Sequence, residues 1–332
     1  MTEGRVRPTN GEASPAPLAL IRGAGDLASG VAVRLWRAGF AVVMTEIAEP
    51  TPVRRTVAFA EAVYAGRTDV EGIEGVKTAD AADAVRATRR GAVAVVVDPD
   101  ATLKHDLEPC LLVDAIMAKR NLGTRIGDAP AVIALGPGFV AGRDVHAVIE
   151  TRRGHTLGRV IREGEALPNT GVPGEVGGRA EERLLRAPCA GVFAATARIG
   201  DILAPDQAVG RVGDAPVRAR IPGVLRGLLR PGLDVREGTK LGDVDPRGRP
   251  EHCSLVSDKA LAVAGGVLEA ACELLGGVRF AAVGADVACA RGRRADAAGI
   301  DAARAYALHE DASRPAALVC DGHGGPSAER ST

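Results

Sequence analysis

Short apolar runs alternate with glycine turns and amphipathic stretches through the first half of the chain. The run that begins at Leu18 ends in glycines at Gly23 and Gly25, which predicts a buried strand that enters a tight turn. Apolar residues then recur at helical spacing as far as Gly39, whose position favours the end of a helix. The ordered part of the chain is therefore expected to begin with a strand, a turn and a helix.

The segments that follow repeat this alternation. Residues 41–46 indicate a second strand and residues 54–65 a helix. Three later runs are almost continuously apolar, as expected of parallel strands covered on both faces; they are GAVAVVVDP, CLLVDA and AVIALGPGF. We therefore predict an α/β fold with a Rossmann-like, doubly wound sheet, and assign residues 18–178 to it as a nucleotide-binding domain.

The pattern changes in residues 184–245, where glycine and proline separate short strand-like pieces. Two segments match at an offset of 32 residues, so that Gly191 corresponds to Gly223 and Gly210 to Gly242. Two such repeats predict a small β-sandwich module that resembles the barrel-sandwich hybrid of biotinyl and lipoyl carrier domains. The hairpin between the halves, GDAPVRAR, has no lysine, so we expect neither biotin nor lipoate to be attached.

The remaining segments complete the predicted organisation. The stretch SDKALAVAGGVLEAACELL is predicted to be a helix capped by Ser257 or Asp258, and residues 253–292 are assigned to this C-terminal helix and one further strand. Residues 1–17 are polar and proline-rich, and residues 293–332 are weakly patterned. Both ends are predicted to be disordered or mobile.

Composition narrows the classes of partner. The 332 residues include 42 lysines and arginines against 42 aspartates and glutamates, and only 2% are aromatic, which disfavours nucleic acid as a partner. The six cysteines show neither CxxC nor zinc-site spacing, so no metal site is predicted and a reducing compartment is favoured. The N-terminus lacks the apolar segment of a signal peptide, and no run has the length of a membrane span. We therefore expect a cytoplasmic protein without a membrane partner.

The first glycine turn carries the strongest candidate chemistry. Gly23 and Gly25 would bring backbone N–H groups, at the start of a helix, to a phosphate. Asp26 in the first helical turn is also a candidate site residue, and its charge would compete with a pyrophosphate. Glu46 ends the second predicted strand, where an acidic residue can bind a ribose hydroxyl. A turn that serves packing alone stays the alternative.

Polar residues after the later strands are predicted to meet at the same edge of the sheet, because the carboxyl ends of parallel strands converge there. Donors in these loops predict a site for a small anionic ligand, with solvated loops and a simple linker as the alternatives. The further candidates are Asp114, Lys119, Arg120, Asn121, Gly136, Gly138, Asn169 and Thr170. Catalytic residues are not identified, because the sequence contains no triad, P-loop or metalloprotease motif.

Several stretches together resemble the YqeB family, accessory proteins of the selenium-dependent molybdenum hydroxylase system with an XdhC-like Rossmann half. They include RGAGDLASGVAVRL, VDAIMAKRN, LGPGF, DVHAVIETRRGHTLG, PNTGVPGE and SDKALAVAGGVLEA, within residues 18–275. The resemblance implies an accessory or maturation protein for a molybdenum hydroxylase of the xanthine dehydrogenase type, which binds a nucleotide or a molybdopterin-type cofactor. The implied partners are that hydroxylase or its cofactor-assembly proteins, and no catalytic residues are implied.

Two other functions stay open at this point. One is an NAD(P)-dependent oxidoreductase, which needs a proton donor beside the nicotinamide. The other is a non-enzymatic scaffold whose β-module docks a hydroxylase subunit. The candidate cofactors are accordingly NAD(P) and a molybdopterin-type cofactor, and the residues do not decide whether the protein is an enzyme.

Overall fold

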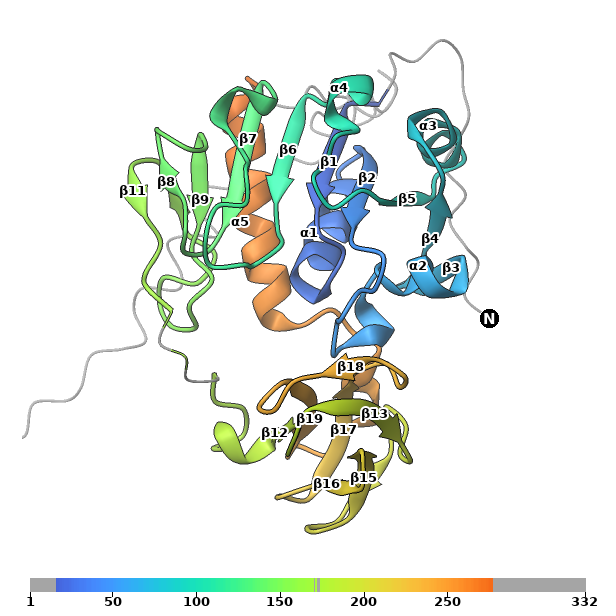
Figure 1. Cartoon of the computed structure of the whole chain (residues 1–332). Helices are drawn as coiled ribbons and strands as arrows, with labels where there is room; N and C mark the ends of the chain where they lie inside the picture. Colours follow the sequence, from blue (N-terminus) through green and yellow to red (C-terminus); the bar gives the residue numbers. More distant parts are fainter. Residues whose placement is uncertain (1–15, 170, 172–173, 277–332) are drawn as a thin grey trace, which may run out of the picture. The chain divides into compact units, whose positions relative to one another are not determined.

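The computed structural model describes residues 16–169, 171 and 174–276, which all belong to one compact unit (Figure 1). This part of the chain contains five α-helices and four β-sheets. Four sequence-based expectations fall outside the described residues: Thr170, most of the segment 1–17, the strand expected within 277–292, and the tail 293–332.

The largest sheet has nine strands and is mixed. Its strands are β1 (Leu18–Arg22), β2 (Ala41–Glu46), β3 (Arg67–Val70), β4 (Ile73–Thr78), β5 (Val93–Val97), β6 (Leu111–Asp114), β7 (Ala131–Leu135), β9 (Ala147–Ile149) and β10 (Val160–Ile161). They lie in the order β10-β9-β7-β6-β1-β2-β5-β4-β3. Neighbours from β9 to β4 run parallel, whereas the edge strands β10 and β3 are antiparallel to their neighbours.

Helices cover the faces of this sheet. The α-helices of the described residues are α1 (Asp26–Arg37), α2 (Glu61–Ala65), α3 (Ala81–Arg89), α4 (Lys104–Leu107) and α5 (Asp258–Leu274). The described residues also contain the 3-10 turns η1 (Arg55–Val57), η2 (Ile126–Asp128), η3 (Glu181–Arg183) and η4 (Pro250–Cys253). Apolar side chains of α1 and α5 share a cluster with Ile21 of β1, and those of α3 share another with Leu20, whose side chain points to the opposite face. Within the described residues, none of the helices combines the length and apolar character needed to cross a membrane.

Helices α1 and α5 lie side by side because small residues meet at their interface (Figure 1). A Cβ added at Gly30 of α1 would lie 2.8 Å from the Cβ of Ala260, near the start of α5. A Cβ added at Gly266 of α5 would clash with the carbonyl oxygen of Gly158. Gly30 therefore permits the close approach of the start of α5 to α1, and Gly266 permits the close approach of α5 to the segment at Gly158.

Residues 184–245 form two antiparallel sheets of four strands each. The strands are β12 (Leu184–Arg186), β13 (Gly191–Ala195), β14 (Ile202–Leu203), β15 (Ala208–Val212), β16 (Ala215–Arg218), β17 (Gly223–Leu228), β18 (Asp234–Val235) and β19 (Lys240–Asp245). The sheet orders are β12-β19-β17-β14 and β16-β15-β13-β18. The sequence repeat has a structural counterpart, since Gly191 begins β13 and Gly223 begins β17, with φ values of 149° and 152°. A separate two-stranded sheet joins β8 (Val140–Ala141) to β11 (Gly164–Glu165).

The predicted fold class was wrong. Instead of a Rossmann-like, doubly wound sheet followed by a barrel-sandwich module, the chain has a mixed nine-stranded sheet and two further sheets of four strands. In the Rossmann order the first three strands are adjacent, but here β5 lies between β2 and the hairpin of β3 and β4. In the smaller region the repeats exchange strands, because β14 pairs with β17 and β18 with β13. The apolar pattern identifies buried strands, yet it carries no information on which strands become neighbours.

Candidate functional site

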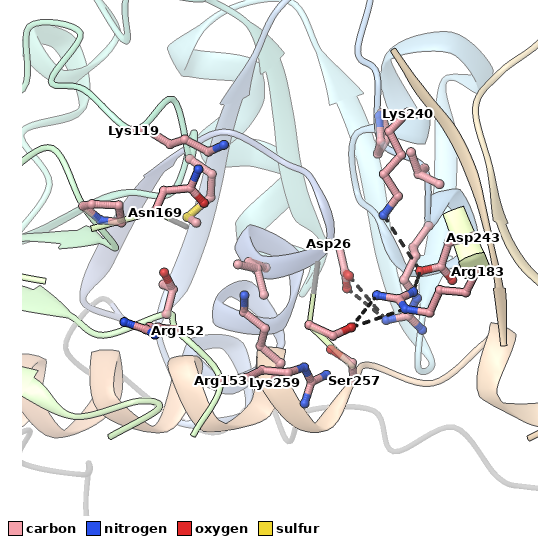
Figure 2. A pocket seen from close by; sticks show the side chains of 18 of the residues that line it. Asp26, Lys119, Arg152, Arg153, Asn169, Arg183, Lys240, Asp243, Ser257 and Lys259 are labelled. Carbon is pink, nitrogen blue, oxygen red and sulfur yellow. Dashed lines mark hydrogen bonds and ion pairs between the residues drawn. The ribbon is translucent and has the colours of Figure 1, made fainter. Parts of the chain in front are cut away.

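A cavity of about 760 Å³ lies among the first turn of α1, the loops after β6 and β7, the start of α5 and strands β17 and β19. Its lining is strongly cationic, because two acidic side chains, Asp26 and Asp243, face eight basic ones. The basic residues are Arg54, Lys119, Arg152, Arg153, Arg183, Arg226, Lys240 and Lys259. Figure 2 shows Lys119 and Asn169 at one side of the view, and Lys240 and Asp243 at the other.

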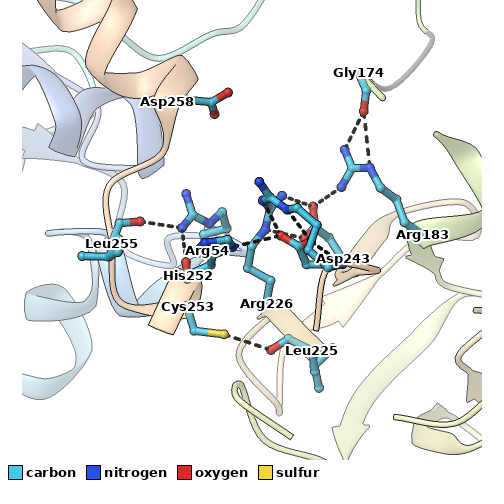
Figure 3. Close-up of polar contacts among 12 residues, drawn as sticks. Arg54, Gly174, Arg183, Leu225, Arg226, Asp243, His252, Cys253, Leu255 and Asp258 are labelled. Carbon is cyan, nitrogen blue, oxygen red and sulfur yellow. Dashed lines mark hydrogen bonds and ion pairs between the residues drawn. The ribbon is translucent and has the colours of Figure 1, made fainter. Parts of the chain in front are cut away.

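Asp243 of β19 is the centre of a buried ion-pair network (Figure 3). Its two carboxylate oxygens accept hydrogen bonds from Arg226, each at 3.0 Å. Arg183 forms a further ion pair with it, and the amine of Lys240 lies 3.8 Å away. Burial by itself raises the pKa of Asp243, but Arg226, Lys240 and Arg183 outweigh it and lower that pKa to about 2. Arg183 and Arg226 are thus already occupied within the protein.

The network continues at Asp245, which is fully buried on the same strand. Its carboxylate accepts hydrogen bonds from Arg226 at 3.2 Å and from Arg247 at 2.6 Å. Burial opposes ionisation of Asp245, whereas its hydrogen bonds to Arg247 and the charge of Arg226 lower its pKa. Arg226 is therefore shared between two carboxylates.

Arg54 connects the start of α1 to the segment that precedes α5. Its Nη1 donates to Asp26 Oδ1 at 3.2 Å, and its Nη2 donates to the carbonyl oxygens of His252 and Leu255 at 3.0 and 2.8 Å (Figure 3). Arg54 is only 6% exposed. This buried arginine compensates the charge of Asp26, the acidic residue that would oppose an anion at this end of the cavity.

Three cations of the lining have no ion-pair partner among the described residues: Lys119, Arg152 and Lys259. With the Asn169 amide turned so that its oxygen faces the lysine, that oxygen accepts a hydrogen bond from Lys119 at 3.0 Å. Lys119 and Arg152 are exposed, so solutes can reach their charged groups. Burial lowers the pKa of Lys259 and that of Lys240. With eight basic side chains against two carboxylates, the lining carries more positive charge than its own carboxylates neutralise.

The predicted glycine turn precedes α1, but its groups are largely used within the protein. Gly23 has a φ of 92°, and its N–H donates to the carbonyl oxygen of Thr45. Glu46 accepts a hydrogen bond from the N–H of Ala24 at 2.8 Å. Gly25 is the N-cap residue of α1. The turn thus presents fewer free N–H groups than its sequence indicates.

The predicted residues after β6 differ in their surroundings. Asp114 is 2% exposed, accepts a hydrogen bond from Thr124 at 2.6 Å and pairs with Arg22 at 3.2 Å. The side-chain oxygen of Asn121 accepts from the N–H of Thr124 at 2.9 Å, which holds the loop in place. Arg120 is exposed and lies outside the cavity lining. Asp114 and Asn121 therefore have structural contacts that account for their polarity.

The two predicted glycines after β7 allow close approaches of neighbouring segments. Gly136 and Gly138 have φ values of 71° and 108°, which favour glycine. A Cβ at Gly136 would lie 2.6 Å from Thr151 Oγ1, and one at Gly138 would lie 2.6 Å from the Cα of Arg120. Gly138 thus permits the close approach of the loops after β6 and β7, and Gly136 permits that of the segment after β9.

Of the predicted site residues, the structure brings Asp26, Lys119 and Asn169 to one cavity. Sequence reasoning missed most of the charged lining, which comes from distant segments: Arg54, Arg152, Arg153, Arg183, Arg226, Lys240, Asp243 and Lys259. Some of these residues lie in stretches that carry the family resemblance, such as the arginine pair in ETRRGHTLG and the lysine in SDKALA, and this was the one sequence feature that could have indicated them. Single charged residues in such stretches are indistinguishable from solvated ones without the fold.

The chemistry of the lining suits anions rather than metal ions. Guanidinium and ammonium groups donate charge-assisted hydrogen bonds to carboxylates and phosphates. Both lining carboxylates are already paired with arginines. Among residues that the structure describes, no three His, Cys, Asp or Glu side chains are gathered in a way that could hold a metal ion.

Comparison with solved structures gives only distant likenesses. The product-bound ectoine utilization protein EutE from Ruegeria pomeroyi has a TM-score of 0.21 at 13% identity, over 69% of this chain and 85% of its own. An aspartoacylase family protein from Mesorhizobium loti gives 0.22 at 11%, over 69% and 85%. A succinylglutamate desuccinylase/aspartoacylase from Rhodobacter sphaeroides gives 0.21 at 14%, over 69% and 92%. Scores this low carry no argument about the activity of this chain.

The comparisons contradict the predicted accessory role in a molybdenum hydroxylase system. None of the three structures is described as a hydroxylase accessory protein, and the matching sequence relative is described only as uncharacterized. That prediction, including nucleotide binding and cofactor maturation, was wrong. We carry forward neither it nor its alternatives of an NAD(P)-dependent oxidoreductase and a hydroxylase-docking scaffold.

Sequence comparison gives a much closer match. No family model matches the chain. The "Uncharacterized protein YqeB" of Escherichia coli (strain K12) is 50% identical over 258 residues, which are 78% of this chain and 48% of that protein. The chain thus spans about half the length of the curated relative it matches. Over its matched residues, this similarity supports membership of the chain in the YqeB family.

Proposed function

We propose that this protein binds a small molecule with more than one anionic group, such as a dicarboxylate, in the cationic cavity. The observation that carries the proposal is the presence of three lining cations, Lys119, Arg152 and Lys259, without an ion-pair partner among the described residues. Like charges gathered in a cavity repel one another, so an arriving anion relieves this repulsion as well as forming hydrogen bonds.

The lining divides into cations that are already neutralised and cations that are available. Arg183 and Arg226 pair with Asp243, and Arg54 pairs with Asp26, so these arginines are already neutralised within the protein. Arg152 is exposed and has a planar guanidinium group that suits bidentate binding of a carboxylate. Lys119 would bind a second anionic group as a point charge.

Size and total charge favour a small ligand over a polymer. A volume of about 760 Å³ falls within the range of roughly 300–1,000 Å³ that is usual for small-molecule sites. The chain as a whole has a formal net charge of zero, whereas proteins that bind polyanions usually carry net positive charge. Positive charge concentrated in one cavity of a neutral protein supports recognition of a compact anion.

A thermal-shift comparison of succinate with succinamide tests the proposal, since the two molecules share a shape and differ in charge. We expect succinate to raise the melting temperature of the full chain at constant ionic strength, because a ligand that binds only the folded state stabilises it. Succinamide should leave that temperature unchanged. An equal response to both compounds, or none to a series of di- and tricarboxylates and phosphate, would overturn the proposal.

A further inference from the structure

We infer that Lys259 is a reactive amine, which forms an imine with the carbonyl group of a 2-oxo dicarboxylic acid bound in the cavity. The inference rests on the proposed function and names the ligand class more narrowly. An acid of this class carries a carbonyl next to one of its two carboxylates. The cations that bind the carboxylates would therefore also bring the carbonyl carbon to the lysine.

The position of Lys259 sets it apart from an ordinary surface lysine. It is the second residue of α5, directly after the helix start that Ser257 caps by accepting a hydrogen bond from the N–H of Ala260 at 3.1 Å. The positive end of the helix dipole disfavours an ammonium group there. Figure 2 shows the side chain extending from the start of α5, with Arg153 beside it.

The carboxylates near Lys259 all have other partners. Asp26 is paired with Arg54 at 3.2 Å, and Asp258 with Arg153 at 2.9 Å. Glu150 is 2% exposed, and its two oxygens accept the backbone N–H groups of residues 152 and 167 at 2.7 and 2.8 Å. Lys259 itself has no ion pair or hydrogen bond from its amine among the described residues. Its charge is therefore poorly compensated.

The titration of Lys259 agrees with this geometry. Burial is the main cause that lowers its pKa, and the neighbouring charge of Arg153 lowers it further. Asp26, Glu150 and Asp258 act in the opposite direction without cancelling these effects. A lysine desolvated beside another cation has a larger share of neutral amine, which is the nucleophilic form.

The other two lysines of the cavity are placed less favourably for this chemistry. Lys119 is exposed to solvent, and its amine already donates a hydrogen bond to the side-chain oxygen of Asn169. Burial lowers the pKa of Lys240 as well, but its amine lies 3.8 Å from the ionised carboxylate of Asp243, which acts in the opposite direction. These two lysines suit charge recognition, whereas Lys259 suits nucleophilic attack.

The proposed step needs no oxidant or reductant. The neutral amine attacks the carbonyl carbon and forms a C–N bond, while the π electrons of the C=O bond move to oxygen. A proton passes from nitrogen to that oxygen, which gives a carbinolamine. The hydroxyl then departs with a proton as water, and the nitrogen lone pair completes the C=N bond. One amine and one ketone thus give one imine and one water.

Reductive trapping tests the inference on the full chain. The protein is incubated with 2-oxoglutarate and sodium cyanoborohydride, and adducts are located by mass spectrometry of the intact chain and its peptides. We expect Lys259 to be labelled about tenfold faster or more than Lys104, which lies outside the cavity lining and pairs with Asp128 at 2.8 Å, because a bound ketone has a high effective concentration at the amine. The Lys259→Arg variant should lose the fast adduct.

A second ligand separates failure of the inference from failure of the proposed function. 2-Hydroxyglutarate carries the same two carboxylates without a ketone, and calorimetry measures whether it binds. Binding of 2-hydroxyglutarate with equal labelling of Lys259 and Lys104 would overturn the inference and leave the proposed function standing. Faster labelling of Lys119 or Lys240 than of Lys259 would overturn the inference as well. Absence of binding by both acids would overturn the two together.

Discussion

The carboxylate of Glu46, at the end of β2, accepts a hydrogen bond from the backbone N–H of Ala24 at 2.8 Å. Its second oxygen accepts from the N–H of Ile47, also at 2.8 Å. The acidic side chain that the sequence offers as a partner for a ribose hydroxyl therefore fills the glycine turn from within. The N–H of Ala24, which a phosphate would need as a donor, is therefore already hydrogen-bonded. For this reason we place the candidate site in the cavity and not at the glycine turn.

Replacing Glu46 by alanine should reduce stability without affecting ligand binding. The substitution leaves the N–H of Ala24 without its charge-assisted partner, which typically costs about 1–3 kcal/mol. Urea unfolding measures this loss, and the exposed Glu49→Ala variant is the matched control, with an expected change within about 0.5 kcal/mol. Similar losses in both variants would contradict a structural role for Glu46.

Adjacent glycines of α5 should respond in opposite ways to alanine. At Gly265 an added Cβ meets nothing within 4 Å, so Gly265→Ala should stabilise the helix by up to about 1 kcal/mol. At Gly266 it would clash with the carbonyl oxygen of Gly158, so Gly266→Ala should destabilise the fold by about 1–3 kcal/mol. The denaturant midpoints of the two variants measure both effects. A stabilising Gly266→Ala substitution would contradict the close packing of α5 against Gly158.

Asp243 should make the stability of the protein sensitive to acid. Its pKa of about 2 in the folded chain lies below its usual value of 3.8, so its contribution is present above about pH 4 and is lost as the pH falls toward 2. The Asp243→Asn variant leaves Arg183 and Arg226 without their shared carboxylate, which should cost about 3–5 kcal/mol at neutral pH.

Unfolding curves recorded between pH 2 and 7 provide the measurement for Asp243. The difference in stability between the wild-type chain and Asp243→Asn should shrink toward pH 2, because the wild-type carboxylate becomes protonated there. Asp258, whose pKa is also about 2, remains in both proteins and cancels in the difference. A difference that stays constant across this range would argue against ionised Asp243 as the source of stability.

The sequence predicts single elements better than their arrangement. The strand Ala41–Glu46 lies where the apolar run predicts it, and Ser257 caps α5 as its side-chain chemistry indicates. Residues 54–65 contain only a 3-10 turn and the short helix α2 instead of one helix. Local propensity governs such elements. The order of the nine strands depends on pairings between distant segments, which a single sequence does not reveal.

The candidate site shows the same limit. Lys119 is predictable because it follows a buried strand, and Asn169 because it lies in a glycine- and proline-rich loop; the structure brings both to the cavity. Arg54 and Lys259 are far apart in the chain, and their meeting depends on the packing of α5 beside α1. The sequence shows which side chains are charged, but only the fold shows which of them lack an ion-pair partner among the described residues.

Calorimetry tests most directly whether the cavity binds small anions. Succinate is titrated into three proteins: the wild-type chain, the Lys119→Ala variant and the Arg236→Ala variant. Arg236 is exposed and lies outside the lining, so it controls for loss of one positive charge. We expect one equivalent of succinate to bind the wild-type chain and Arg236→Ala with similar affinity. Lys119→Ala should bind about tenfold more weakly, because it loses one charge-assisted contact. Equal affinity of all three proteins, or no binding to any of them, would contradict an anion site in this cavity.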